Sequence, residues 1–424
     1  DATFYGCSAL KQIIFPETIE VIGIDAFANS GLETINLPKK VMKIGECAFD
    51  NCGNLTRAVL PKSIQVMGAC GFRYCKNLSE VEIEEGTTKI FNATFGGCSG
   101  LKQIKLPESL EAIGNLAFAG SGLETIDLPK KVREIGKCAF QDCVNLTRVE
   151  LPKSIKVMEP SIFRNCKSLE KVEIEEGITQ IPDATFWGCD GLKQIELPES
   201  LEVIGIAAFS DCKNLIEIVF PKSMKEIGRN AFQKCLRLDK IVFEGDIEKI
   251  DESAFIVCGS LLSHQTEDSV EKAGNDSKNS DGDVVPLNVQ ELGRNAFRSC
   301  NSLLNRPIKV IKKIGENAFI NCEDIREIEL GDDITEVPDG AFKGCKNLYK
   351  VKVSENIRTI GKEAFFGCKK LSEAELPKEI DKIDDYAFAC CNNLSSIGKN
   401  TDAKGTSVRE IGKDAFFRCI ELNT

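Results

Sequence analysis

The stretch Cys98–Gly120, CSGLKQIKLPESLEAIGNLAFAG, contains in one unit the pattern that decides the fold. Ile104 and Leu106 alternate with polar residues as in a strand, and Pro107 ends that strand because proline cannot donate to a ladder. Gly114 permits a turn before an Ala-Phe segment that is too short for a full α-helix. The apolar positions of the unit are Leu101, Ile104, Leu106, Leu110, Ile113, Ala117 and Phe118. So short a unit cannot bury its apolar face alone, which predicts that units stack.

The same unit recurs along the whole chain, anchored by a Phe that usually follows Ala. The steps between anchors are 22 or 23 residues, with two longer steps of 42 and 28 residues. The 18 anchors are Phe4, Phe27, Phe49, Phe72, Phe95, Phe118, Phe140, Phe163, Phe186, Phe209, Phe232, Phe255, Phe297, Phe319, Phe342, Phe365, Phe388 and Phe416. Near copies that begin at Ala2, Ala93 and Ala184 also lie 91 residues apart, which indicates duplication of a four-unit block.

The unit resembles the BspA-like type of leucine-rich repeat, as Leu123–Cys143 (LETIDLPKKVREIGKCAFQDC) illustrates. The resemblance implies a mainly β repeat solenoid, a right-handed superhelix of about 18 coils, one for each anchor. One parallel sheet would run along a face, with short turns or 3₁₀ segments on the return path. It also implies a recognition or adhesion role at the surface of host-associated microbes and protists, without an active site.

The 42-residue step between Phe255 and Phe297 separates two runs of units and predicts the domain organisation. Coils are expected at residues 1–262 and 283–424, around an insertion at 263–282 (SHQTEDSVEKAGNDSKNSDG) that is polar and acidic enough to stay a loop. The whole is interpreted as one continuous solenoid, truncated at both ends. A solenoid needs polar capping units, so uncapped ends predict end-to-end association with a second copy.

Composition excludes several classes of function. The chain has 424 residues, with 54 Lys+Arg against 65 Asp+Glu, and a net charge of −11 argues against a nucleic-acid partner. No apolar run approaches the roughly 20 residues of a membrane span. The single histidine, His264, leaves almost no room for Ser-His-Asp, Cys-His or His-rich metal chemistry. We therefore expect a non-enzymatic protein with no catalytic residue, cofactor or metal.

Sixteen of the 20 cysteines stand three residues after an anchor Phe, including Cys52, Cys75, Cys98, Cys143, Cys166 and Cys189. Ser30 and Ser121 replace Cys in the two remaining units. This cysteine column is interpreted as structural: reduced, buried thiols that pack as small hydrophobes. A metal site is disfavoured because a linear column does not converge on one point.

Four cysteines lie outside the column. Cys47 and Cys70 occupy equivalent positions in adjacent units, so their Cα atoms could fall within disulfide range, whereas Cys138 has no such neighbour. Together with Cys390, they are interpreted as chance placements of small residues. So many free thiols are easiest to keep in a reducing compartment, which supports a cytoplasmic location as the alternative to the cell surface or secretion. Burial of the thiols and an oxygen-poor habitat would reconcile them with an extracellular location.

The outward strand positions carry charges of both signs, which is typical of a solvated face. Val219, Val242 and Val284 depart from this pattern as an apolar stripe on three successive predicted strands, with Glu217 and Lys240 beside them. Because loops on rigid scaffolds often carry binding function, the stripe and the adjoining loop, which contains His264, are the candidate partner site. His264 itself is interpreted as a solvated bystander.

The sequence thus predicts a module that binds a macromolecule. A protein is the expected ligand and a glycan the second, although aromatic platforms for sugars are missing from the outward positions. An intracellular protein-protein scaffold and a passive spacer of a larger surface protein remain as alternatives. The near-identical 91-residue blocks suit a spacer, since duplication lengthens an array without refining a site.

Overall fold

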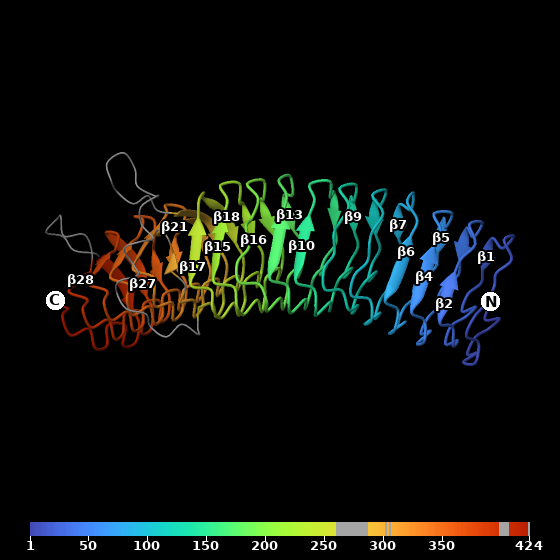
Figure 1. Cartoon of the computed structure of the whole chain (residues 1–424). Coiled ribbons are helices and arrows are strands. Elements are labelled where there is room, and N and C mark those ends of the chain that lie inside the picture. The colour runs from blue at the N-terminus through green and yellow to red at the C-terminus, as the bar shows by residue number, and fades with distance from the viewer. Residues whose placement is uncertain (260–286, 302, 305–306, 398–406, 423–424) are drawn as a thin grey trace. The chain divides into compact units, whose positions relative to one another are not determined.

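The computed structural model describes residues 1–259, 287–301, 303–304, 307–397 and 407–422. The chain divides into two compact units, Asp1–Ser200 (unit 1) and Leu201–Thr424 (unit 2). Each unit is a β-solenoid whose neighbouring coils are joined by parallel strand pairs (Figure 1). The expected division around residues 263–282 falls largely on residues outside the described ranges and stays a prediction.

The first row of strands follows the Leu-x-x-Ile-x-Leu part of each unit, as the sequence predicts. Its side chains alternate: in β10 (Arg148–Leu151) Val149 and Leu151 are buried while Arg148 and Glu150 are exposed. This is the period of two expected for a sheet with one buried face. In unit 1 the row contains β2 (Thr34–Asn36), β4 (Arg57–Leu60), β6 (Glu80–Ile83), β10 and β12 (Lys171–Ile174).

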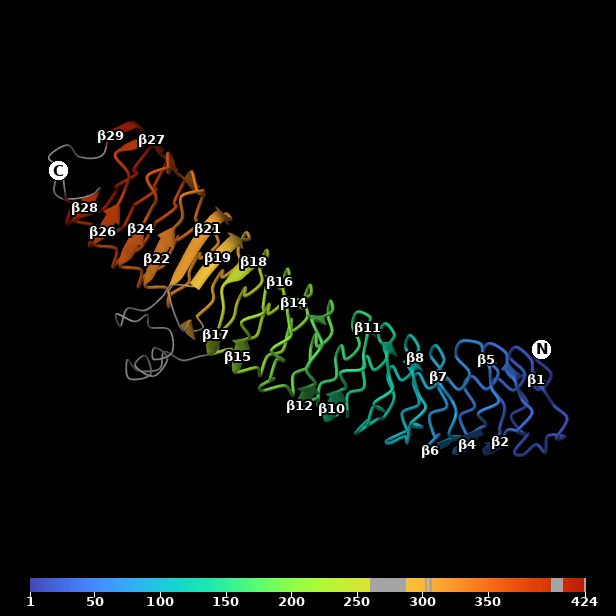
Figure 2. The same ribbon diagram turned by 90° about the horizontal axis from the view of Figure 1, so that it is seen from above.

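A second row of parallel strands runs along the return path, in addition to the one sheet expected. Figure 2 shows its strands along the opposite side of unit 1 from β2, β4, β6, β10 and β12. Most are two residues long, an exposed residue followed by a buried one, too short to produce a recognisable alternation in the sequence. In unit 1 they are β1 (Val21–Ile22), β3 (Lys43–Ile44), β5 (Val66–Met67), β7 (Lys89–Ile90), β8 (Ala112–Ile113), β9 (Glu134–Ile135), β11 (Val157–Met158) and β13 (Gln180–Ile181).

The anchor phenylalanines stack ring on ring at the centre of each unit. From Phe4 to Phe186 in unit 1 the centroids of successive rings lie 4.9–6.0 Å apart. From Phe209 to Phe416 in unit 2 they lie 5.0–5.5 Å apart. Such offset-stacked pairs stabilise beyond the burial of their area. The stack therefore ties each coil to the next.

Two residues in the left-handed backbone conformation, with positive φ, shape the corner around each anchor Phe. One lies two positions before the Phe in the sequence and the other two positions after it. Around Phe27 these are Asp25 (φ 53°) and Asn29 (φ 59°). The amides of all three donate to carbonyls of the next coil, at 2.9 Å for Asp25, 2.8 Å for Phe27 and 2.9 Å for Asn29. The compact Ala-Phe corner is thus a hydrogen-bonded ladder of turns, in agreement with the expectation that it is too short for a helix.

Unit 2 repeats both rows. Its first row contains β15 (Glu217–Phe220), β17 (Lys240–Phe243), β20 (Leu303–Leu304), β22 (Glu327–Leu330), β24 (Lys350–Lys352), β26 (Glu373–Glu375) and β28 (Ser396–Ile397). Its second row contains β14 (Val203–Ile204), β16 (Glu226–Ile227), β18 (Ile247–Ile250), β23 (Glu336–Val337), β25 (Thr359–Ile360), β27 (Glu379–Ile383) and β29 (Ser407–Ile411).

Two longer strands, β19 (Leu287–Leu292) and β21 (Ile308–Ile314), interrupt this regular plan. β19 pairs with β18 of the second row, and β21 pairs with β19 and, through Ile308–Val310, with β22 of the first row. The run IKVIKKI in β21 contains no proline or glycine, so nothing divides it into two short strands. The two rows therefore merge after the long step.

Candidate binding surface

The predicted partner site lies on two neighbouring first-row strands of unit 2. β15 and β17 pair in parallel so that Val219 stands opposite Val242 and Glu217 opposite Lys240. Lys240 Nζ donates to Glu217 Oε1 at 2.8 Å, which neutralises both charges beside the valines. Val219 is 37% exposed and Val242 is half-buried. The structure thus brings four of the six predicted residues together.

The inward side of the same strands is rigidly packed. Phe220 and Phe243 stack at 4.9 Å, and Phe220 meets the anchor Phe232 edge-on at 5.6 Å. Both strand phenylalanines are buried, at 0% and 2% exposure. Because packed aromatic rings leave little room for rearrangement, the valines above them are held at fixed positions.

Ile216 enlarges the apolar surface and was missed by the sequence analysis. It directly precedes β15 and is 40% exposed. Its carbonyl accepts hydrogen bonds from the Asp239 and Lys240 amides, at 2.7 and 3.2 Å, which fix it beside β17. The equivalent position holds Thr56, Ser79 or Thr147 in other coils, so an isoleucine there was a readable signal. We call Ile216, Val219 and Val242 the apolar patch.

Val284 and His264, the other two predicted site residues, lie outside the described residues. The described strand that pairs with β17 is β20, with Leu303 opposite Lys240 and Leu304 opposite Ile241. β20, which follows Cys300, is thus the described neighbour of β17 on this side, and the predicted contribution of Val284 to the site stays a prediction.

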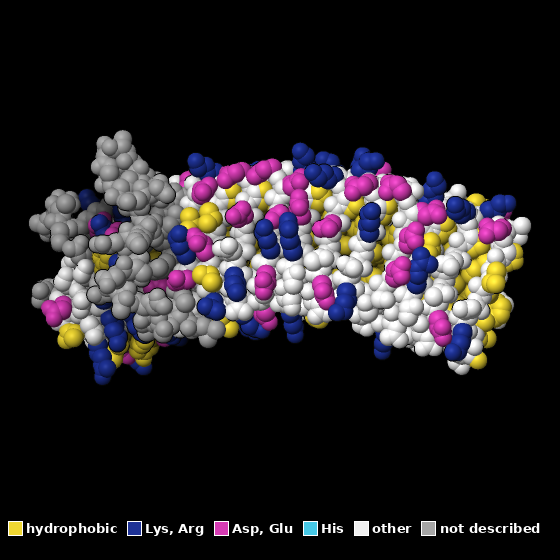
Figure 3. Space-filling model, viewed as in Figure 1, with side chains coloured by type: hydrophobic (Ala, Val, Ile, Leu, Met, Phe, Trp, Pro, Cys, Tyr) yellow, Lys and Arg dark blue, Asp and Glu magenta, His cyan; other side chains and the backbone are white. Residues whose placement is uncertain are grey.

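Ion pairs cover the equivalent positions in unit 1. Arg57 contacts Glu80 at 2.9 Å and Glu82 at 3.1 Å, and Arg148 contacts Glu173 at 3.2 Å. Cross-strand pairs of this kind compensate charge on a solvated face. Figure 3 shows the mixture of charges on this face, with hydrophobic side chains gathered beside the atoms drawn in grey and also at the N-terminal end. The apolar patch therefore interrupts the ion pairs that cover the equivalent positions of β4, β6, β10 and β12.

The cysteine column is buried and hydrogen-bonded. Each thiol donates to the anchor carbonyl of the preceding coil at 3.1–3.2 Å, at Cys52, Cys75, Cys98, Cys143, Cys166 and Cys189. Ser30 and Ser121 continue the column, each 3.4 Å from the next cysteine sulfur. Burial raises the pKa of the Cys143 thiol to about 11. The Cys98, Cys143 and Cys166 thiols, whose pKa burial raises, are therefore protonated at neutral pH and shielded from reagents.

The described residues contain no group of three or more His, Cys, Asp or Glu side chains arranged to hold a metal ion. Within the same ranges, no helix has the length and apolar character needed to cross a membrane.

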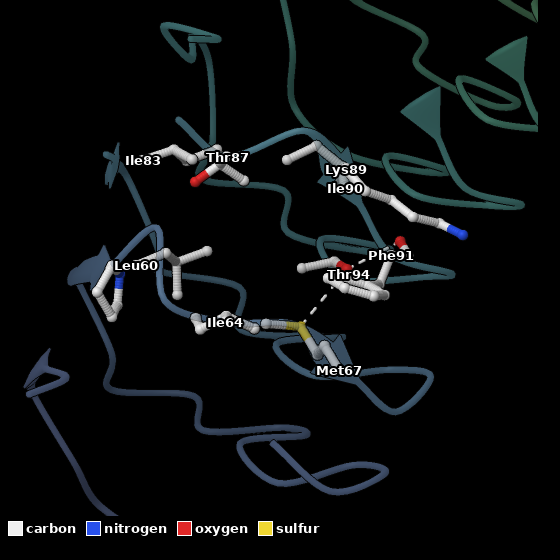
Figure 4. Close-up of a pocket in the computed structure, with 10 residues that line it drawn as sticks. Leu60, Ile64, Met67, Ile83, Thr87, Lys89, Ile90, Phe91 and Thr94 are labelled. Carbon is white, nitrogen blue, oxygen red and sulfur yellow. Dashed lines mark hydrogen bonds between the residues drawn. The ribbon is translucent and has the colours of Figure 1, made fainter. Parts of the chain in front are cut away.

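A small apolar cavity lies between two coils of unit 1, lined by Leu60, Ile64, Met67, Ile90 and Thr94 among others (Figure 4). Its volume is about 20 Å³, the space of a single water molecule. Thr94 stands where most coils have Ala, and its hydroxyl donates to the Phe91 carbonyl at 2.8 Å. Ligand pockets are an order of magnitude larger. We interpret the cavity as a packing gap.

A wider hollow of about 520 Å³ is lined by Ile155, Met158 and Ile178, which lie 91 residues after Ile64, Met67 and Thr87. The hollow therefore lies at the equivalent place in the next copy of the 91-residue block, where it is much wider.

The repeat is shared with known proteins. The family model of the BspA type leucine rich repeat region, in six copies, matches residues 1–119, 65–193, 179–304, 278–395 and 312–424. A leucine-rich repeat protein from Bacteroides ovatus is 27% identical, with a TM-score of 0.58, over 97% of this chain and 91% of that chain.

Two further solved structures match with lower TM-scores. A leucine rich cell surface protein from Faecalibacterium prausnitzii is 24% identical, with a TM-score of 0.38, over 88% of this chain and 91% of that chain. The leucine rich repeat protein of T. pallidum is 28% identical, with a TM-score of 0.35, over 46% of this chain and 82% of that chain. No curated protein sequence matches the chain.

Proposed function

The chain belongs to the BspA type of leucine-rich repeat proteins, and from this premise we propose that it is a cell-surface module for adhesion or host interaction that binds a protein through the apolar patch. Leucine-rich repeat proteins generally mediate protein interactions and are typically non-enzymatic. The finer assignment, to a surface role and to this patch, is our proposal.

The observation that carries the proposal is the exposed apolar patch on rigid strands. Ile216 and Val219 keep 40% and 37% of their surface in contact with solvent, and the positions equivalent to Ile216 hold Thr56, Ser79 and Thr147 in other coils. Burying aliphatic surface stabilises a complex by about 25 cal/mol per Å². Because β15 and β17 are already ordered by the Phe220–Phe243 stack, binding there costs little conformational entropy.

The aliphatic character of the patch favours a protein ligand over a glycan. Protein interfaces have an apolar centre surrounded by polar groups, and here the Glu217–Lys240 ion pair borders the valines. Sugar sites instead use aromatic rings with hydrogen-bonding partners, and the patch has no ring. Glycan binding and end-to-end self-association stay predictions of the sequence analysis.

An intracellular scaffold is the second candidate, and one observation favours it. The 20 cysteines are in the reduced form, outside disulfides, a state that is easiest to maintain in a reducing compartment.

A photo-crosslinking residue at position 219 tests the patch. A matched control carries the same residue at position 150, the equivalent exposed position of β10 in unit 1. We expect a covalent adduct from position 219 and none from position 150. Equal adducts from both positions would reject the patch as the binding surface.

Protease treatment of intact source cells tests the location, with lysed cells as the control. Release of peptides from this repeat without lysis supports the surface role. Protection until lysis supports the intracellular scaffold instead and directs the search to cytoplasmic partners.

A further inference from the structure

Cys47 and Cys70 stand apart from the cysteine column. Each lies two residues before an anchor Phe, at a left-handed corner residue with φ of 52° and 65°. Both side chains are half-buried, whereas the column cysteines between Cys52 and Cys391 are buried. These two thiols are therefore open to small reagents from solvent.

The backbone holds the two residues in direct register. Cys47 N donates to the Ala69 carbonyl at 2.9 Å, and Phe49 N donates to the Gly71 carbonyl at 2.9 Å. In a parallel ladder this pattern places Cys47 opposite Cys70 and Phe49 opposite Phe72. The coil spacing is measured two residues further on, where the Phe49 and Phe72 rings stack at 4.9 Å.

That spacing suits a covalent bond between the sulfurs. Directly opposed residues of adjacent parallel segments lie about 4.8 Å apart, within the 4.4–6.8 Å range of Cα separations in disulfides. The surroundings agree with close approach: desolvation, followed by the neighbouring Cys70 thiol and the Asp50 carboxylate, raises the pKa of Cys47 to about 11.

The other cysteines lack this arrangement. Cys138 occupies the same corner position, but the residues opposite it are Leu116 and Ser161. Column thiols do follow one another between coils, yet the buried ones from Cys52 to Cys189 donate to backbone carbonyls, as in the 3.1 Å contact from Cys98 to the Phe72 oxygen. Their burial also shields them from reagents.

We propose that Cys47 and Cys70 form a disulfide between adjacent coils when the protein meets a low-molecular-weight disulfide. The Cys70 sulfur, as the thiolate, attacks the reagent and forms a mixed disulfide, releasing one thiol. Cys47, whose raised pKa keeps it mostly protonated at neutral pH, then loses its proton to water and attacks the Cys70 sulfur of that mixed disulfide, releasing the second thiol. Two protein thiols are oxidised to one disulfide, and the reagent is reduced to two thiols.

The bond would crosslink two adjacent coils of unit 1. It closes a loop that contains β4 and joins the corners that precede Phe49 and Phe72, so these two coils could not separate without reduction. A module that moves from a reducing to an oxidising environment would thereby gain local rigidity without any change of fold. The inference is independent of the apolar patch, which lies in unit 2.

Peptide mapping tests the proposal on the full chain. The reduced protein is incubated with oxidised glutathione, the remaining thiols are blocked, and the chain is digested with trypsin without reduction. We expect Ile44–Arg57 and Ser63–Arg73 to be recovered as one linked species. Because Cys52 shares the first peptide, Cys52→Ser is expected to keep the link and Cys47→Ser or Cys70→Ser to abolish it. Serine occupies the column position naturally at Ser30 and Ser121.

A matched variant tests whether this register alone brings two corner cysteines within disulfide range. Cys138 N donates to the Pro160 carbonyl at 3.1 Å and Phe140 N to the Ile162 carbonyl at 2.9 Å, the same register as at Cys47. Ser161→Cys is therefore expected to create a second link, from Cys138 to position 161. Recovery of Cys47 and Cys70 as separate glutathione adducts, or as free thiols at every oxidant concentration, overturns the proposal.

Discussion

Removing two neighbouring rings from the Phe stack should reveal a coupling free energy that more distant rings lack. Phe140 and Phe163 are both fully buried, and their ring centroids lie 5.5 Å apart with planes inclined by 9°. Replacing either ring by Leu keeps part of the apolar volume, so we expect a loss of about 1–3 kcal/mol, less than the 3–5 kcal/mol typical of Phe→Ala. The ring-ring term should add a coupling of about 0.5–1.5 kcal/mol in a double-mutant cycle.

The single tryptophan provides the assay. Trp187 follows the anchor Phe186 and has the Arg164 guanidinium 3.6 Å above its ring centre, so its fluorescence reports on this part of unit 1. Denaturant unfolding of Phe140→Leu, Phe163→Leu and the double variant gives the free energies of the cycle. A local probe matters because coils of a solenoid need not unfold together.

The control cycle uses Phe95 and Phe163, whose rings are separated in the stack by Phe118 and Phe140. Distant substitutions add within about 0.3–0.5 kcal/mol. Equal coupling in the two cycles, or none between Phe140 and Phe163, would refute the claim that ring contacts tie adjacent coils together.

Three further predictions concern burial, backbone space and pH. Maleimide at neutral pH should leave the buried thiols of Cys98 and Cys143 unmodified until the chain is denatured, because burial raises the pKa of these thiols to about 12 and about 11. Mass spectrometry of the labelled peptides checks this prediction, and labelling of the native chain would contradict it. Gly122→Ala should destabilise unit 1 by about 1–3 kcal/mol, because a Cβ at this position would lie 2.0 Å from the Ser99 carbonyl oxygen. Gly53→Ala, where a Cβ would meet open space, should change the stability by less than about 0.5 kcal/mol, and similar unfolding midpoints for the two variants would contradict the close approach at Gly122. The Asp385 amide and the Lys382 ammonium lower the pKa of Asp384, so the stabilising contribution of this carboxylate is present above about pH 4 and is lost as the pH falls further. The difference between the unfolding midpoints of the wild type and Asp384→Asn should therefore shrink from about pH 7 to about pH 3, and a constant difference would argue against this pKa effect.

The sequence predicts the repeat, the inward positions and the cysteine column because each follows a strict spacing. A Phe at every 22 or 23 residues leaves one way to stack identical units, and the rings do stack. The family expected from Leu123–Cys143 is confirmed by the match over the whole chain.

The second strand row could not be predicted because it depends on pairing between coils. Val21 and Ile22 form a strand only through their partners Lys43 and Ile44, and two residues contain no period of their own. The merger of the rows at β21 likewise results from Ile308–Ile314 contacting both β19 and β22.

The candidate site was predicted in part. Outward valines on successive units, Val219 and Val242, identified the strands that carry it, and their direct opposition follows from the 23-residue step. Ile216 lies just outside the expected strand, at a position that the alternation rule did not include. A comparison of units would have found it, because other coils hold Thr56, Ser79 or Thr147 at this position.

The affinity of the full chain for a protein captured through position 219 tests the central claim most directly. Val219→Lys combined with Val242→Lys places two unpaired ammonium groups on the patch, and a matched variant carries Glu150→Lys on the equivalent strand of unit 1. We predict that the dissociation constant rises by at least about tenfold for the first variant, a cost of about 1.4 kcal/mol, and is unchanged for the second. Unchanged affinity of the double lysine variant, with its fold intact, would contradict the assignment of β15 and β17 as the recognition surface.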